Sequence, residues 1–191
     1  MSPRTEQQFE EIRVTRKKKI MDTALELFAQ EGFDVTSISS IAYKAGISKG
    51  LLYNYFESKE DLIRSIIFNG FDRMSRLIDP NKDGVLTRQE MRFFIKEMFS
   101  ALKEEPYYWK LYFNLFFQPH VLRKVEKRLA VLIKSYLKMF SEYFATIGSE
   151  DPETDAIFFG ALLDGIGFQF MVNPKKFPLE KIKNKLLKMY C

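Results

Sequence analysis

Residues 36–59 read Thr-Ser-Ile-Ser-Ser-Ile-Ala-Tyr-Lys-Ala-Gly-Ile-Ser-Lys-Gly-Leu-Leu-Tyr-Asn-Tyr-Phe-Glu-Ser-Lys, and this stretch decides the fold. It holds two short helical patterns joined by a tight turn at Ala45-Gly46-Ile47. The second pattern ends in the run Tyr53-Asn54-Tyr55-Phe56, which mixes aromatic and polar side chains. Two short helices with a glycine-containing turn between them are typical of a helix-turn-helix, whose second helix enters the major groove of DNA.

Helical patterns also flank this stretch. The preceding one buries a face formed by Ile20, Ala24, Leu27 and Phe28, and Gly32 is placed to end it. We expect residues 1–8, ahead of that helix, to be a flexible arm. Serine or threonine side chains are available to cap the helices that follow, at Thr36 or Ser37, at Ser48 and at Ser58.

The rest of the chain is helical in pattern, so we predict an all-α protein of about nine helices. No alternation of apolar and polar residues is long enough to indicate a strand. We place a helix-turn-helix domain at residues 9–62 and a second helical domain at 63–191. Long amphipathic patterns and proline-bracketed aromatic segments make up the second domain.

Composition limits the function classes. The net charge of the 191 residues is +5, but residues 1–64 contain 10 Lys plus Arg and 10 Asp plus Glu, so bulk charge does not favour DNA binding by this region. Cys191 is the only cysteine, which favours a reducing, cytoplasmic setting. We expect the apolar stretch 156–172 to be too short and too polar to span a membrane, and we expect no membrane partner.

Residues 16–64 resemble the N-terminal domain of the TetR family of bacterial transcriptional regulators. The resemblance is carried by Ala24-Leu25-x-Leu27-Phe28, Gly32-Phe33, Thr36, Ile41-Ala42, Ala45-Gly46, Ser48-Lys49-Gly50-x-Leu52-Tyr53-x-Tyr55-Phe56 and Ser58-Lys59-Glu60-x-Leu62. It implies a dimeric, ligand-responsive regulator, more often a repressor than an activator. Such a dimer reads a palindromic operator whose half-sites are about 34 Å apart.

The predicted DNA contacts lie on the second helix of the motif, taken as 48–56, and at the starts of its neighbours. Lys49 can reach a phosphate or a guanine edge, Gly50 allows close approach, and Asn54 suits adenine. Lys59 is expected to anchor a phosphate at the start of the next helix. The complete set is Thr36, Ser37, Ser48, Lys49, Gly50, Leu51, Tyr53, Asn54, Tyr55 and Lys59.

For the second domain the resemblance implies an effector pocket and dimerisation through the last two helices. Aromatic side chains could line a pocket for a small apolar effector, or they could be ordinary core. The candidates are Phe94, Trp109, Tyr112, Phe113, Phe116 and Phe140. No effector is identified, and no cofactor is certain.

Residues 79–90, Asp-Pro-Asn-Lys-Asp-Gly-Val-Leu-Thr-Arg-Gln-Glu, fit the calcium loop of an EF-hand. Calcium would bind to oxygens of Asp79, Asn81, Asp83, Val85, Thr87 and Glu90. The alternative is a turn followed by a helix cap, because most of these residues are also common in turns. EF-hands also usually occur in pairs, and the chain has one copy.

Two further functions were weighed against the DNA-binding regulator. One is a calcium sensor in which calcium is the effector or the main function and the helix-turn-helix is vestigial. The other is an enzyme. With one histidine and one cysteine in the chain, and no phosphate-binding glycine loop, no catalytic group can be assembled, so we predict that the protein is not an enzyme.

Overall fold

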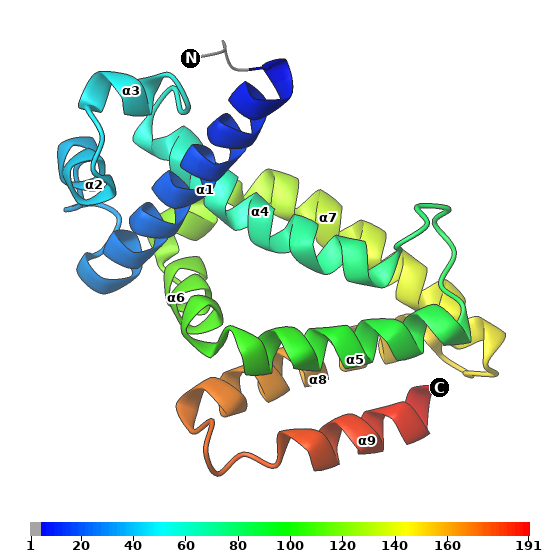
Figure 1. Ribbon diagram of the computed structural model, residues 1–191. Coiled ribbons are helices and arrows are strands. Elements are labelled where there is room, and N and C mark those ends of the chain that lie inside the picture. Colours follow the sequence, from blue (N-terminus) through cyan, green and yellow to red (C-terminus); the bar gives the residue numbers. More distant parts are fainter. Residues whose placement is uncertain (1–4) are drawn as a thin grey trace. The chain divides into compact units, whose positions relative to one another are not determined.

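The computed structural model describes residues 5–191, and all regular secondary structure in this range is helical. The prediction of an all-α protein with nine helices is therefore confirmed for these residues (Figure 1). The helices are α1 (Glu6–Glu31), α2 (Ile38–Ala45), α3 (Lys49–Tyr53), α4 (Lys59–Ile78), α5 (Arg88–Glu104), α6 (Pro106–Phe116), α7 (Pro119–Thr146), α8 (Pro152–Val172) and α9 (Leu179–Tyr190).

The chain folds as two compact units. The first contains residues up to Asn69 together with Leu111–Val125, and the second contains Gly70–Lys110 and Glu126–Cys191. The sequence analysis placed a single boundary after residue 62. In the structure the first unit continues along α4 and also takes in the end of α6 and the start of α7, which a linear boundary cannot describe.

The first unit is built around α1, α2 and α3, with α2 packed against both neighbours. Gly46 ends α2 in the left-handed region, with φ of 71°, where a residue with a Cβ is strained. This turn directs the chain into α3. The interior consists of fully buried apolar side chains that include Ala24, Phe28, Ile41, Ala42, Ala45, Leu52, Phe56, Leu62 and Ile63.

Side-chain caps define where the helices of the first unit begin. Ser37 accepts a hydrogen bond from the N–H of Ser40, and Ser48 accepts one from the N–H of Leu51. Ser58 likewise accepts a hydrogen bond from the N–H of Asp61 at the start of α4, so all three predicted caps are confirmed, with Ser37 rather than Thr36 at α2. The predicted flexible arm is wrong at residues 6–8, because Thr5 and Gln8 form a capping box that starts α1 at Glu6. Residues 1–4 lie outside the described part of the chain.

Hydrogen bonds explain why residues 111–125 belong to the first unit. The hydroxyl of Tyr112 donates to the backbone carbonyl of Ile67 at 2.8 Å, in a buried position. The side-chain amide of Gln118 bonds twice to the end of α1, with Nε2 donating to the Phe28 carbonyl at 2.9 Å and Oε1 accepting from the Phe33 N–H at 3.2 Å. The bond to the Phe33 N–H supplies an acceptor just beyond the end of α1, and the bond to the Phe28 carbonyl adds to the one that this carbonyl accepts from the Gly32 N–H.

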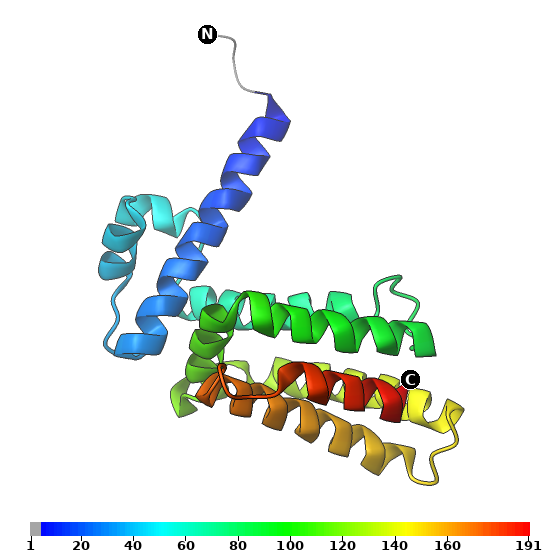
Figure 2. The same ribbon diagram turned by 60° about the horizontal axis from the view of Figure 1, so that its bottom comes forward.

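The second unit has an aromatic core. Figures 1 and 2 show α9 running alongside α5, and the two helices pack together. The Phe94 ring of α5 contacts Phe140 of α7, and Phe140 in turn contacts Phe159 of α8. Tyr190 of α9 closes the cluster against Phe144 and Phe159. The many phenylalanines of the sequence are thus used to join four helices.

Helix α8 is apolar but only partly covered. Among the described helices it alone is long and apolar enough to cross a membrane by length and composition, so the expectation that this stretch is too short and too polar is wrong on that criterion. Only 28% of its most apolar window is buried. Its exposed apolar residues recur at helical spacing and form one face: Ile157, Phe158, Phe168 and Val172.

Candidate nucleic-acid interface

The outer surface of α3 carries the polar and basic side chains that the sequence singled out. Lys49, Gly50 and Asn54 are exposed, and Tyr53 keeps 44% of its surface accessible. The opposite side of the same segment holds Leu52, which is fully buried. One face of α3 therefore anchors it, and the other remains available for a partner.

Helix α3 is shorter than expected. The sequence analysis extended it over 48–56, but Ser48 is its N-cap and the helix ends at Tyr53. Asn54 follows in a turn, and Phe56 then enters the core with 1% exposure. Tyr55 is half-buried between them, and Leu51 is half-buried one turn earlier. Asn54 is therefore presented from the turn that follows the helix.

Gly50 has no structural reason to be glycine within the chain. Its φ is not in the left-handed region, and a Cβ built on it meets no atom within 4 Å. Glycine inside a helix costs roughly 0.5–1 kcal/mol of stability relative to alanine. The structure offers no compensating contact for this cost. Space for the close approach of another molecule is the physical explanation that remains.

The two residues before α2 are placed differently from each other. Thr36 is 1% exposed, and its hydroxyl donates to the Gly32 carbonyl at 2.8 Å. Its side chain therefore serves the loop between α1 and α2 and does not face outward as the sequence prediction assumed. Ser37 is exposed and caps α2. Of this pair, Ser37 alone offers a side chain at the surface.

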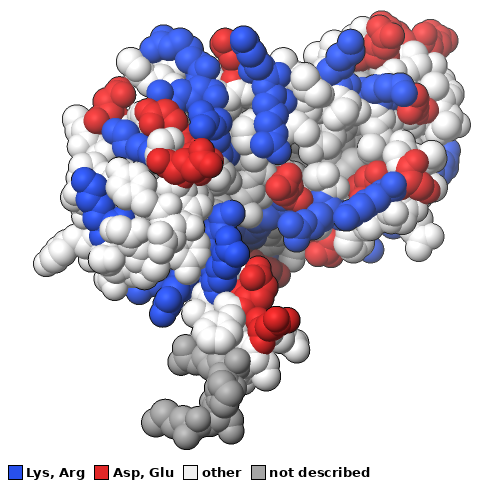
Figure 3. Space-filling model, turned by 90° about the horizontal axis from the view of Figure 1, so that it is seen from above, with Lys and Arg blue, Asp and Glu red and all other residues white. Residues whose placement is uncertain are grey.

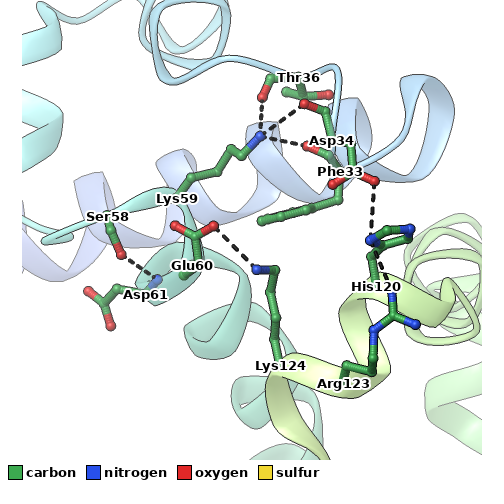
Figure 4. Close-up of polar contacts among 10 residues, drawn as sticks. All are labelled: Phe33, Asp34, Thr36, Ser58, Lys59, Glu60, Asp61, His120, Arg123 and Lys124. Carbon is green, nitrogen blue, oxygen red and sulfur yellow. Dashed lines mark hydrogen bonds and ion pairs between the residues drawn. The ribbon is translucent and has the colours of Figure 1, made fainter.

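Lys59 bonds inward. Figure 4 shows its ammonium group directed at the loop between α1 and α2, where it donates to the carbonyl oxygens of Phe33, Asp34 and Thr36 at 2.8, 3.2 and 3.0 Å. The same nitrogen lies 4.5 Å from the centre of the Phe33 ring. An ammonium group has three N–H donors, and all three are used here. The predicted phosphate contact would require Lys59 to leave these carbonyls.

Further charges surround this loop (Figure 4). Lys124 pairs with Glu60 at 3.3 Å, and His120 Nδ1 lies 3.6 Å from an Asp34 carboxylate oxygen. The pKa of Glu60 is lowered, mainly by a hydrogen bond to its own backbone N–H at the start of α4 and also by Lys124. A lowered pKa stabilises the fold above the ordinary pKa of glutamate, and this contribution is lost as the pH falls through the lowered value.

The predicted effector residues are divided between the two units. Phe94, Trp109 and Phe140 belong to the second unit, where Phe94 and Phe140 have ring centres 5.8 Å apart. Three others belong to the first unit, where the Tyr112 ring stacks on Phe116 and meets Phe113 edge-on. The first-unit group also has a structural role, because Tyr112 bonds to the Ile67 carbonyl.

The loop at 79–90 is closed by its own hydrogen bonds. The carboxylate of Asp79 accepts from the N–H groups of Asp83 and Gly84, and Asp83 accepts from the N–H of Val85 and the amide of Asn81. Glu90 accepts from the backbone and the hydroxyl of Thr87, in the capping box that begins α5. Within residues 5–191 no group of three or more His, Cys, Asp or Glu is arranged to hold a metal.

Sequence reasoning missed two features of this unit. Gln118 was not singled out, and an isolated glutamine between two helices gives no signal of the bonds that it makes to α1. Tyr43 of α2 was also passed over, although it is 88% exposed. Its position opposite the buried face of α2 could have been read from helical periodicity, because its neighbours Ile41, Ala42 and Ala45 form that face.

Part of this unit matches a known family model. Residues 20–66 match the model described as bacterial regulatory proteins, tetR family. Over these residues the chain is similar to that family. The match covers the C-terminal part of α1 from residue 20, all of α2 and α3, and the start of α4, and it agrees with the resemblance inferred from Lys49, Gly50 and Tyr53.

Similar proteins include an uncharacterized HTH-type transcriptional regulator of Bacillus subtilis, YuxN, which is 36% identical over 90 residues, or 47% of this chain and 31% of YuxN. The biofilm operon negative transcriptional regulator IcaR of Staphylococcus aureus is 26% identical over 71% of this chain and 75% of its own. The chain thus spans about a third of YuxN and three quarters of IcaR. Both relatives are described as HTH-type transcriptional regulators.

The fold extends beyond the matched domain. The crystal structure of the regulator FadR from Bacillus subtilis in complex with stearoyl-CoA has a TM-score of 0.67 to this chain. The two align over 91% of this chain and 96% of FadR at 20% sequence identity. At that identity the likeness establishes a shared helical fold.

We predict that Lys59→Met lowers the free energy of unfolding by about 1–3 kcal/mol, because three carbonyls lose a charged donor. Lys49→Met, an exposed lysine on α3, is the matched control and should leave stability unchanged. Thermal and urea unfolding of both variants measures the difference. Equal stability of the two variants would contradict the inward role of Lys59.

Proposed function

We propose that the protein is a ligand-responsive transcriptional regulator that binds a palindromic operator through α3 and acts as a repressor. The observation that carries the proposal is the outer surface of α3, where Lys49, Tyr53 and Asn54 are exposed next to a glycine with open space around it. Exposed cationic, amide and phenol groups on a major-groove helix supply both phosphate and base contacts. The site of action is the cytoplasm, where bacterial DNA is found.

We propose fewer DNA-contacting residues than the sequence analysis did. Ser37, Ser48, Lys49, Gly50, Leu51, Tyr53, Asn54 and Tyr55 remain in it, because each is exposed or half-buried. Thr36 and Lys59 are proposed to act indirectly, by holding the loop between α1 and α2. Repression is supported by the description of IcaR as a negative regulator.

Gly50→Ala tests the function with little risk to the fold. We expect stability to rise by about 0.5–1 kcal/mol, because glycine is a poor helix residue, while operator affinity falls roughly tenfold, because the new methyl group obstructs the DNA. Val131→Ala is the control, because it also replaces a poorer helix residue with alanine, at an exposed position of α7. Fluorescence anisotropy with a duplex selected by the wild-type protein measures the affinity. Unchanged binding by Gly50→Ala would contradict a close approach of DNA at this position.

We propose that two copies associate through α8 and α9. The support is the apolar face of α8, where Phe158 and Phe168 are 56% and 57% exposed, and a single copy leaves this face in water. A two-fold dimer would present two copies of α3 to the two halves of a palindrome. In this proposal the apolar surface of α8 contacts a second copy of the protein and not a membrane.

The dimer is tested by Phe158→Glu. We expect this variant to sediment as a monomer at micromolar concentration and to keep its helical circular dichroism spectrum, because the Phe158 side chain does not belong to the buried core. Val131→Glu is the control, because Val131 is a similarly exposed apolar residue, on α7. A monomeric wild-type protein, or a Phe158→Glu variant that remains dimeric, would contradict the proposal.

For the effector we propose a small apolar molecule that binds among the aromatic side chains of the second domain. The FadR structure is described as a complex with stearoyl-CoA, which makes a long-chain acyl-CoA a reasonable first probe for this chain. The support for an apolar effector is the group of aromatic rings in the second unit, where Phe94 contacts Phe140 and Phe140 contacts Phe159. Release of a bound operator duplex on addition of the probe would support this effector class.

Calcium binding at residues 79–90 is the second candidate activity. It is favoured by Asp79, Asn81, Asp83, Gly84 and Glu90, which match the five specified positions of the EF-hand pattern, and by the positive φ of Gly84, 78°, at the position where that pattern requires glycine. It also requires Glu90 to leave Thr87 and turn to the ion. Calcium would then order the connection between α4 and α5.

Calorimetry on metal-stripped protein tests this candidate. We expect a saturable heat on calcium addition to the wild-type protein and its loss in Glu90→Gln. The variant should fold normally, because glutamine at this position also completes a capping box. Identical weak heats for both proteins at millimolar calcium would contradict calcium binding by residues 79–90.

A further inference from the structure

Helix α1 is much longer than its packing requires. It spans 26 residues, but its buried side chains begin only at Ile20. Among residues 6–19 every side chain is exposed except Ile12, which is half-buried. At 1.5 Å per residue, these 14 positions correspond to about 21 Å of helix without a buried side chain.

The exposed part of α1 is divided by charge. Its beginning is acidic, with Glu6, Glu10 and Glu11, and residues 13–19 then read Arg-Val-Thr-Arg-Lys-Lys-Lys, with five cations and no acid. Figure 3 shows this order on the molecular surface, where acidic side chains lie closest to the grey residues and basic ones follow. Among the ion pairs of the described residues, this stretch contributes one, between Lys18 and Asp22.

The basic stretch lies beside the recognition helix in the same unit. The Lys17 ammonium is 5.6 Å from the ring centre of Phe56, which follows α3. The Lys19 ammonium is the nearest atom to Gly46, in the turn before α3, at 3.9 Å from the position that a Cβ would occupy. Lysines from α1 thus lie near both ends of α3.

The remaining surface of the motif is poor in available cations. Between residues 20 and 62 the chain has three cationic side chains, all of them lysines. Lys44 pairs with Glu26 at 3.1 Å and Lys59 bonds to three carbonyls, so Lys49 is left. Proteins that bind duplex DNA tightly neutralise several phosphates. The cations for further phosphate contacts must come from another element, and residues 13–19 supply them.

We propose that residues 13–19 of α1 form a second DNA contact, which binds the phosphates of duplex flanking the base pairs read by α3. This inference rests on the proposed function. The partner is identified by charge complementarity, because a run of exposed cations without an acid matches the regular charge of a duplex backbone. The contact adds affinity and salt dependence but no base specificity.

The test compares wild-type full-length protein with the double variant Arg16→Gln/Lys17→Gln. Lys175→Gln/Lys176→Gln, which removes the same charge from an exposed loop before α9, is the matched control. The probes are one palindromic duplex selected by the wild-type protein and the same duplex extended by about six base pairs at each end, a length that matches the exposed part of α1. Affinities are measured over a range of salt concentrations.

We expect the wild-type protein and the control to bind the extended duplex more tightly than the short one. Arg16→Gln/Lys17→Gln should lose this gain, with a salt slope lower by about 0.9 for each phosphate contact removed. Equal wild-type affinity for both duplexes, with the same salt slope in all three proteins, would overturn the inference and leave the proposed function standing. Failure of the wild-type protein to bind any selected duplex would overturn both. Equal slopes on DNA, together with variant-sensitive binding to phosphatidylglycerol vesicles, would assign the stretch to a membrane surface instead.

Discussion

The hydrogen bonds of Lys59 to three carbonyls of one loop are the constraint on which the first unit depends. The loop between α1 and α2 runs through Phe33, Asp34 and Thr36 without regular structure, so its carbonyls need donors from elsewhere. Lys59 supplies them from the start of α4, and Gln118 holds the preceding end of α1. With this loop fixed, α2 begins at one place, and the left-handed turn at Gly46 then sets the direction of α3.

A five-residue helix cannot be stable by itself, because nucleation of a helix costs more than one turn of hydrogen bonds returns. Helix α3 exists because Leu52 and Phe56 are buried on one side and Ser48 caps its start. Its outer side is consequently held still without being covered. A rigid, uncovered helix that carries cationic, amide and phenol groups is preorganised for DNA, since little conformational entropy remains to be lost on binding.

Much of the fold could be predicted from the sequence, because apolar spacing and cap residues are local signals. The buried residues Ile41 and Leu52 follow from three- and four-residue apolar periodicity, and the capping serines follow from their residue type at the starts of the helical patterns. The features that could not be predicted depend on contacts between residues that are far apart in the sequence. The inward bonds of Lys59 and the role of Gln118 depend on loops 23 to 90 residues away, and no local pattern records them.

The two units also differ in how directly their residues indicate a function. The proposed DNA contact of α3 rests on surface residues that can be named one by one, whereas contacts between aromatic rings in the second unit do not by themselves distinguish a ligand pocket from an ordinary core. The apolar face of α8 is the exception, since its exposure in one copy calls for a partner.

The most direct test of this account is selection of duplexes from a random pool by the full-length protein. The account predicts enrichment of a palindrome whose half-sites are centred about one helical turn apart or a multiple of it, because each of two copies contributes one α3. Recovery of unrelated sequences, or of no duplex above background, would contradict the claim that α3 reads DNA.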